Sequence, residues 1–233
     1  MADSPKKVFQ VAALVFNGAD ILDICGPLCF LSDTLYNSDI NNPEPAFKIH
    51  VIGDGPIVGI GAIPLNLKVE MNYQEALERL TSFDILVVPG GPTGVIRRII
   101  DEPDSSVLSF VKSFCTLRRE KVDDPPILFS VCTGGLLLAA AGALTGISAT
   151  THHLCLEDLR KIDGTVNVIS SVDDKDQATR YVDGGLNKDG IRVVTAGGVT
   201  CGLDGSLFVA ELKVGRGAAE MTAKINEYQW KRA

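Results

Sequence analysis

Two unbroken apolar runs, each ending in a pair of glycines, constrain the fold of this chain more than any other feature. The first, Asp84–Gly91, reads Asp-Ile-Leu-Val-Val-Pro-Gly-Gly, and the second, Ile127–Gly135, reads Ile-Leu-Phe-Ser-Val-Cys-Thr-Gly-Gly. A strand without polar alternation is typical of a sheet that is covered on both faces, as parallel sheets are. The chain is therefore predicted to be a layered α/β protein.

Other strand-like and helical segments alternate around these two runs. With no internal repeat, low-complexity stretch or linker, the pattern predicts one domain over residues 1–233, a doubly wound α/β sandwich with a mostly parallel central sheet. Further strands are predicted at Val8–Phe16, Phe47–Gly53, Val166–Ser170, Tyr181–Asp183 and Ile191–Thr195, with a hairpin-like excursion over Gly55–Leu67. Helices are predicted at Asp23–Tyr36 (entered through Gly26-Pro27), Tyr73–Leu80, Val107–Arg119, Gly135–Ala143, Glu157–Ile162, Leu207–Val214 and Ala218–Trp230, with loops at Asn37–Pro45 and Pro92–Ile100.

Charge and hydropathy exclude several classes of function. A formal net charge of -7 argues against a protein that neutralises nucleic-acid phosphates or an anionic membrane surface. No apolar run approaches the roughly 18 residues of a membrane span, and Val8–Phe16 is interpreted as a buried strand instead of a signal segment. The sequence therefore predicts a cytoplasmic protein with no nucleic-acid or membrane partner.

The six cysteines are scattered through apolar contexts, and none forms a Cys-x-x-Cys pair. That spacing predicts no disulfide framework and no metal site, and most of the six are expected to be small buried side chains. Cys132 differs because it lies between an apolar strand and Thr-Gly-Gly at the start of an apolar helix. This is the arrangement of a nucleophile elbow, in which the helix N-terminus is expected to lower the thiol pKa. Cys132 is thus the candidate nucleophile.

Three further groups are candidate partners of Cys132. Gly90 and Gly91 end the neighbouring buried strand, and their amides are expected to face the same edge of the sheet as donors for an anionic intermediate. Asp23 lies between apolar residues at the start of a predicted helix, where it is either a proton shuttle or a simple helix cap, and Asp20 is the weaker candidate. A histidine base would have to be His50, His152 or His153.

Five segments together resemble the ThiJ/PfpI superfamily, which has a flavodoxin-like, class I glutamine-amidotransferase-like fold. They are Leu22–Pro27, Val88–Gly91, Phe129–Gly135, Ala149–His152 and Thr195–Asp204, so that the resemblance runs nearly from end to end. The residue after the cysteine is Thr133, where the peptidase-like and chaperone-type branches carry histidine. The chain looks most like the isocyanide hydratases, and also like the amidase-like sensor domains of some transcription regulators.

The hydratase resemblance implies a cofactor-free lyase reaction. Cys132 would attack the terminal carbon of an isocyanide, and water would release an N-substituted formamide from the thioimidate. The resemblance gives Asp23 the role of proton carrier, and gives Thr133 and the Gly91 amide the roles of positioning substrate or stabilising charge. It places His152 at the lining of the site and Asp204 near it, as support for the cysteine loop. Cys25 and His153 depart from the hydratase pattern, which usually has Thr and an aromatic residue there.

Two other functions stay open at this point. One is a glutathione-independent glyoxalase-like conversion of 2-oxoaldehydes on the same cysteine, which Asp23 disfavours because superfamily members with this activity usually pair the thiol with glutamate. The other is a non-enzymatic dimer that senses redox state or a ligand through Cys132. The resemblance also implies a homodimer, for which the apolar Leu28–Leu35 segment is the candidate interface.

Overall fold

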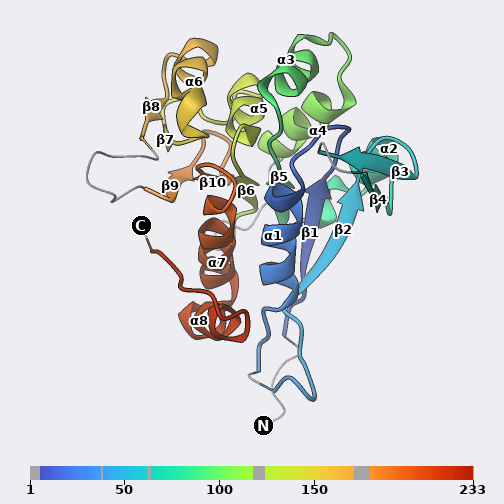
Figure 1. Cartoon of the computed structure of the whole chain (residues 1–233), viewed down its shortest axis with the longest axis vertical. Helices are drawn as coiled ribbons and strands as arrows, with labels where there is room; N and C mark the ends of the chain where they lie inside the picture. The colour runs from blue at the N-terminus through green and yellow to red at the C-terminus, as the bar shows by residue number, and fades with distance from the viewer. Residues whose placement is uncertain (1–5, 38, 62–63, 118–123, 171–178, 233) are drawn as a thin grey trace.

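The central sheet of the computed structural model has six strands, and its interior strands are parallel (Figure 1). The structure describes residues 6–37, 39–61, 64–117, 124–170 and 179–232. Every pair of neighbours in the sheet is parallel except the last, which is antiparallel. The strand order is β2 (Phe47–Ile52), β1 (Phe9–Leu14), β5 (Ile85–Val88), β6 (Ile127–Ser130), β10 (Arg192–Ala196) and β9 (Tyr181–Leu186).

Helices cover both faces of this sheet, which confirms the predicted α/β class with a mainly parallel sheet. On β5, Leu86 and Val88 pack into the cluster that includes α3, α4 and α5, while Ile85 and Val87 pack into the cluster that includes α1 and α7. Figure 1 shows α1 and α7 lying side by side. The helices are α1 (Ile21–Ser32), α2 (Tyr73–Glu78), α3 (Thr93–Asp101), α4 (Ser106–Cys115), α5 (Gly134–Ala140), α6 (Leu156–Ile162), α7 (Cys201–Val214) and α8 (Arg216–Ile225).

Short elements complete the structure. The antiparallel pair β3 (Ile57–Ile60) and β4 (Leu65–Lys68) is the hairpin that the sequence predicts. The parallel pair β7 (Ser148–Ala149) and β8 (Asn167–Val168) lies outside the main sheet, and single 3₁₀ turns are η1 (Leu80–Ser82) and η2 (His153–Cys155). Within the described residues, no helix is both long enough and apolar enough to cross a bilayer.

Two predicted boundaries near the sheet edge are wrong. The Pro92–Ile100 segment is a helix, α3, because Pro92 precedes its first turn and Ile96 and Ile99 bury one face. Helix α1 begins at Ile21 and not at Gly26-Pro27, since the side chain of Asp20 caps it and Pro27 lies inside it. The end of the predicted helix Val107–Arg119 lies outside the described residues. Most of the Asp173–Arg180 segment, for which no structure was predicted, also lies outside them.

The strand order places a topological switch between β1 and β5. From β1 the chain moves outward to β2, and it later returns to the other side of β1 as β5, followed by β6. Ligands of open α/β sheets bind beyond the carboxyl ends of the strands at such a point. The segments that follow β1, β5 and β6 carry Asp23, Gly90 and Cys132, respectively.

Candidate active site

Cys132 occupies a strained turn between β6 and α5. Its φ of 57° lies in the left-handed region, which costs a residue with a Cβ about 1–3 kcal/mol and persists only where the surroundings enforce it. The surroundings do so here, because the Cys132 N–H donates to the Gly197 carbonyl at 2.9 Å and the Thr151 hydroxyl donates to the Cys132 carbonyl at 2.7 Å. The residue is 7% exposed. The predicted elbow is therefore present, held on both sides by neighbouring segments.

The glycine that follows the elbow is needed for close packing of α5 against β5. A Cβ on Gly134 would lie 2.4 Å from the Val88 carbonyl oxygen, well inside contact distance. A larger residue would push the helix away from the strand and would move the cysteine with it. The Gly-Gly signal in the sequence thus has a direct steric cause.

Asp23 lies on the first turn of α1 and is fully buried. Its Oδ2 accepts a hydrogen bond from the Gly90 N–H at 3.0 Å. Its Oδ1 has no hydrogen-bond partner among the described residues, although the Cys132 thiol is near enough to lower the pKa of the carboxyl group. The thiol and the carboxyl group are therefore adjacent, without a hydrogen bond of ordinary geometry between them. A buried carboxyl oxygen left free beside a cysteine can exchange protons with it.

The two groups shift each other's titration. Burial first and the charge of Asp20 second raise the pKa of Asp23 to about 7, against the opposing effects of the Gly90 amide and the Cys132 thiol. Burial also raises the pKa of Cys132 to about 12, with the charge of Asp23 as the next cause. The predicted lowering of the thiol pKa is therefore wrong, because these two effects outweigh the N-terminus of a short helix. At neutral pH the thiol is neutral and the carboxyl is the group that titrates.

Thr133 and the two glycines after β5 form a backbone clamp. The Thr133 hydroxyl accepts from the Gly91 N–H at 2.9 Å and donates to the Gly91 carbonyl at 2.7 Å. The Gly90 N–H is bonded to Asp23. Both amides that we expected to be free for an anion thus have partners within the protein. Their observed role is to fix Asp23 and the cysteine turn relative to each other.

The amides that face the sulfur come from elsewhere. The backbone N–H groups of Val199 and Thr133 are hydrogen-bonded to the Cys132 side chain and act to lower its pKa. Val199 has a φ of 33°, a second strained residue at the site. The Val199 amide was not among the predicted site groups. Its signal was Gly197-Gly198, which follows β10 just as Gly90-Gly91 follows β5.

His152 lies beside the loop that carries Val199. A Cβ on Gly198 would be 2.9 Å from His152 Cδ2, so the imidazole packs directly on that glycine. Its Nδ1 accepts from the Leu154 N–H at 3.3 Å, and its ring stacks on His153 with centroids 4.5 Å apart. Partial burial and the neighbouring His153 lower its pKa. His50 lies elsewhere, buried between Glu70 and Gln10.

Asp204 is fully buried on α7 in a network of its own. Its Oδ2 accepts from Arg180 Nε at 2.7 Å and from the Tyr228 hydroxyl at 2.9 Å, and its Oδ1 accepts from the Lys231 N–H at 2.8 Å. The same arginine donates to the Thr200 hydroxyl at 3.0 Å. Asp204 therefore joins the C-terminal segment to the start of α7, and its hydrogen bonds do not reach the thiol.

Replacement of Gly90 with alanine is expected to disturb this site. The new Cβ would lie 2.5 Å from Thr133 Oγ1 and 2.6 Å from Thr133 N, and we expect the free energy of unfolding to fall by about 1–3 kcal/mol. Gly94→Ala is the matched control, because no atom lies within 4 Å of its Cβ position and alanine favours a helix. Urea denaturation of both variants measures the difference. Equal stability of the two would contradict this packing.

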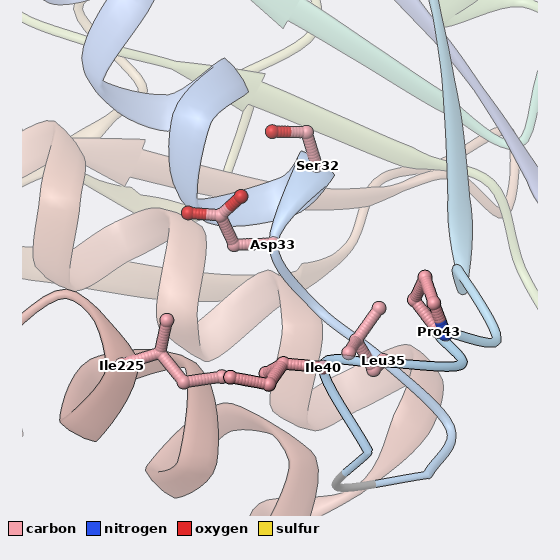
Figure 2. A pocket seen from close by; sticks show the side chains of 6 residues that line it. All are labelled: Ser32, Asp33, Leu35, Ile40, Pro43 and Ile225. Carbon is pink, nitrogen blue, oxygen red and sulfur yellow. The ribbon is translucent and has the colours of Figure 1, made fainter.

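A separate hollow of about 260 Å³ lies at the far end of α1 (Figure 2). Among the described residues that line it, Asp33 is the charged one, and its Oδ2 accepts from Asn226 Nδ2 at 3.1 Å and from Cys29 Sγ at 3.8 Å. The lining residues are Ser32, Asp33, Leu35, Ile40, Pro43 and Ile225. Cys132 and Asp23 are not among these lining residues, so the hollow is separate from the candidate active site.

Comparison with known proteins gives one consistent family. The model of the DJ-1/PfpI family matches residues 10–210. The isonitrile hydratase of Pseudomonas putida is 30% identical over 219 residues, which are 94% of this chain and 78% of that protein.

Solved structures share the fold. A ThiJ/PfpI family protein from Pseudomonas syringae superimposes with a TM-score of 0.69 at 23% identity, over 97% of this chain and 78% of its own. DJ-1beta of Drosophila melanogaster superimposes with a TM-score of 0.68 at 17% identity, over 96% of this chain and all of its own. At these identities the likeness supports the fold alone.

Proposed function

Because this chain belongs to the DJ-1/PfpI family, we propose that it is a cofactor-free isocyanide hydratase that uses Cys132 as its nucleophile. The observation that carries the proposal is the free, buried Oδ1 of Asp23 beside the thiol on the strained turn. The similarity to an isonitrile hydratase supports the choice of substrate. The substrate would be a small molecule that reaches the sulfur from the carboxyl edge of the sheet.

In the first step, the sulfur forms a bond to the terminal carbon of the isocyanide. Because the thiol is neutral at pH 7, its proton has to leave as the bond forms, and the Asp23 carboxylate is the adjacent acceptor. Asp23 then gives that proton to the same carbon. The product is a thioimidate, R–N=CH–S–Cys132, in which every atom of substrate and thiol is retained.

In the second step, water adds to the thioimidate carbon. Asp23 takes a proton from the water and gives it to the substrate nitrogen, so that the intermediate is R–NH–CH(OH)–S–Cys132. The carbon–sulfur bond then breaks, the sulfur recovers the hydroxyl proton through Asp23, and R–NH–CHO leaves. The Val199 and Thr133 amides that face the sulfur would stabilise the negative charge that develops on it in both steps.

The remaining predicted site residues receive supporting roles in this scheme. Thr133 positions the cysteine turn through its clamp on Gly91, and Gly90 positions Asp23. His152 supports the Gly198–Val199 loop and borders the site. Asp204 holds the start of α7 through Arg180 and Thr200.

Turnover of an isocyanide by the purified protein tests the proposal. We expect an aryl or alkyl isocyanide to be converted to its formamide, measured by chromatography, without added metal or cofactor. A parallel incubation with methylglyoxal and no glutathione tests the glyoxalase-like alternative. Formamide at the rate of buffer alone would reject the hydratase proposal, and loss of methylglyoxal would replace it.

The structure gives less support to a redox sensor. The thiolate is the form that peroxide oxidises, and burial together with Asp23 raises the pKa of Cys132. A neutral thiol is better suited to a reaction in which Asp23 removes its proton while the sulfur attacks a carbon atom of the substrate.

We also propose that the protein is a homodimer. Two apolar side chains in Leu28–Leu35, Phe30 and Leu31, are buried in the core of the chain itself, and Leu28 and Leu35 are partly buried. The outward face of α1 is left with Leu22, which is 38% exposed, and with the exposed Cys25 and Cys29. Sedimentation is expected to give about twice the chain mass of 24.8 kDa, and a mass of one chain would contradict the dimer.

A further inference from the structure

Asp20 and Asp23 are tied to the same glycine at the start of α1. The Asp20 N–H donates to the Gly90 carbonyl at 2.9 Å, and the Gly90 N–H donates to Asp23 Oδ2 at 3.0 Å. The Asp20 side chain turns back over the helix end, where its Oδ1 accepts from the Leu22 N–H at 2.9 Å and from the Asp23 N–H at 3.4 Å. Two carboxyl groups are therefore held on one helical turn, and the inner one is fully buried.

The other titratable groups that face Asp23 carry no positive charge. Cys132 reaches it from the turn between β6 and α5, and Cys201 reaches it from the start of α7. The connection between β5 and α3 contributes the neutral Gly90 amide. Within the part of the chain that the structure describes, no lysine, arginine or histidine acts on the Asp23 carboxyl. The negative charge of Asp20 is thus not neutralised at Asp23 by a nearby cation.

We propose that Asp20 is a positioning residue whose negative charge, fixed by the helix cap, makes the Asp23 carboxylate a stronger base. This inference rests on the proposed function, in which Asp23 has to take a proton from a neutral thiol. A carboxylate of ordinary acidity is a poor acceptor for a thiol proton, and a like charge nearby reduces that mismatch. After burial, the charge of Asp20 is the largest cause that raises the pKa of Asp23.

The competing explanation is that Asp20 only caps α1. Aspartate, asparagine and serine are about equally good N-cap residues, since each offers a side-chain oxygen to the first helical amides. Asp20→Asn and Asp20→Ser therefore keep the cap and remove the charge. At pH 5, where Asp23 is protonated in the folded protein, both variants are expected to unfold in urea within about 0.5 kcal/mol of the wild type, and either one is sufficient for the test.

The experiment measures two pH profiles in the full chain. One is kcat/KM for an isocyanide, and the other is the rate at which iodoacetamide alkylates Cys132, followed on its own peptide by mass spectrometry because Cys25 and Cys29 are exposed. In the wild type, both rates are expected to fall with decreasing pH through about 7, where Asp23 becomes protonated. In either Asp20 variant, this fall is expected to move by up to about one pH unit to lower pH.

Salt provides a second readout that a helix cap does not affect. Because Asp20 is only partly buried, salt screens its charge, and 1 M NaCl is expected to shift the wild-type profile toward that of the variants. If the pH profiles of the wild type and the Asp20 variants coincide at low salt, the proposed role of Asp20 is wrong. If no isocyanide is converted, the proposed function falls alone, because the alkylation profile still decides the role of Asp20. If isocyanide is converted and neither profile moves, only the Asp20 inference falls.

Discussion

Cys132→Ala is expected to reduce formamide production to the rate of buffer alone, since the variant has no atom that can form the thioimidate. The backbone turn should survive, because the hydrogen bonds that hold it come from the main chain of Gly197 and the hydroxyl of Thr151, and alanine has the same Cβ as cysteine. Circular dichroism and urea denaturation would verify that the fold is kept. Chromatographic assay over several hours, at enzyme concentrations near that of the substrate, gives the sensitivity that this comparison needs.

Cys25→Ser is the matched control for that variant. Cys25 lies on the same helix as Asp23, but its side chain is exposed whereas that of Asp23 is buried. We expect wild-type turnover from it. If Cys132→Ala still made formamide and Cys25→Ser did not, the nucleophile would be the exposed thiol and the mechanism given above would be wrong. Intact-mass measurement of the quenched wild-type reaction should show one added substrate mass, and the Cys132→Ala variant should show none.

The layered fold was accessible from the sequence because its signal is local. Runs such as Ile85–Val88 and Ile127–Ser130 are buried on both faces, and continuous apolar stretches report that directly. The start of α1 was misjudged for a physical reason. Proline is favoured in a first turn, which suggested Pro27 as the entrance, whereas the Asp20 cap and the buried contacts of Asp23 and Ile24 extend the helix toward its N-terminus.

The composition of the site was predictable in part, and its electrostatics were not. The sequence predicted Cys132 and Asp23 as candidate site residues, and the structure places the two side chains next to each other. It did not reveal that the Gly90 and Gly91 amides have internal partners, because that depends on how three connections meet in space. It also predicted a lowered thiol pKa from the helix alone. Burial and the neighbouring carboxyl have the opposite effect, and both are properties of the packed structure.

Asp23→Asn is expected to lower kcat/KM for isocyanide hydration by about 10²–10⁴-fold, the usual contribution of a positioned proton carrier. Asparagine can still accept the Gly90 N–H through its side-chain oxygen, so the turn is retained while the base is lost. The wild-type fall in rate below pH 7 should disappear with the carboxyl group. A variant with the wild-type profile would show that Asp23 carries no proton in the reaction.

Asp23→Asn should lower the activity but raise the free energy of unfolding at high pH. These opposite effects separate a catalytic role of Asp23 from a structural one. The pKa of Asp23 is higher in the folded protein than in the unfolded chain, so its contribution to stability is complete below pH 4 and is lost as the pH rises through about 7. Above pH 7 the folded protein has to keep a buried carboxylate, at a cost of at most about 4 kcal/mol. Asp23→Asn removes that charge, and we therefore expect it to be more stable than the wild type at pH 8 and similar at pH 4. Urea denaturation at the two pH values measures this, and a less stable variant at pH 8 would mean that the ionised carboxylate stabilises the fold, which contradicts the raised pKa of Asp23.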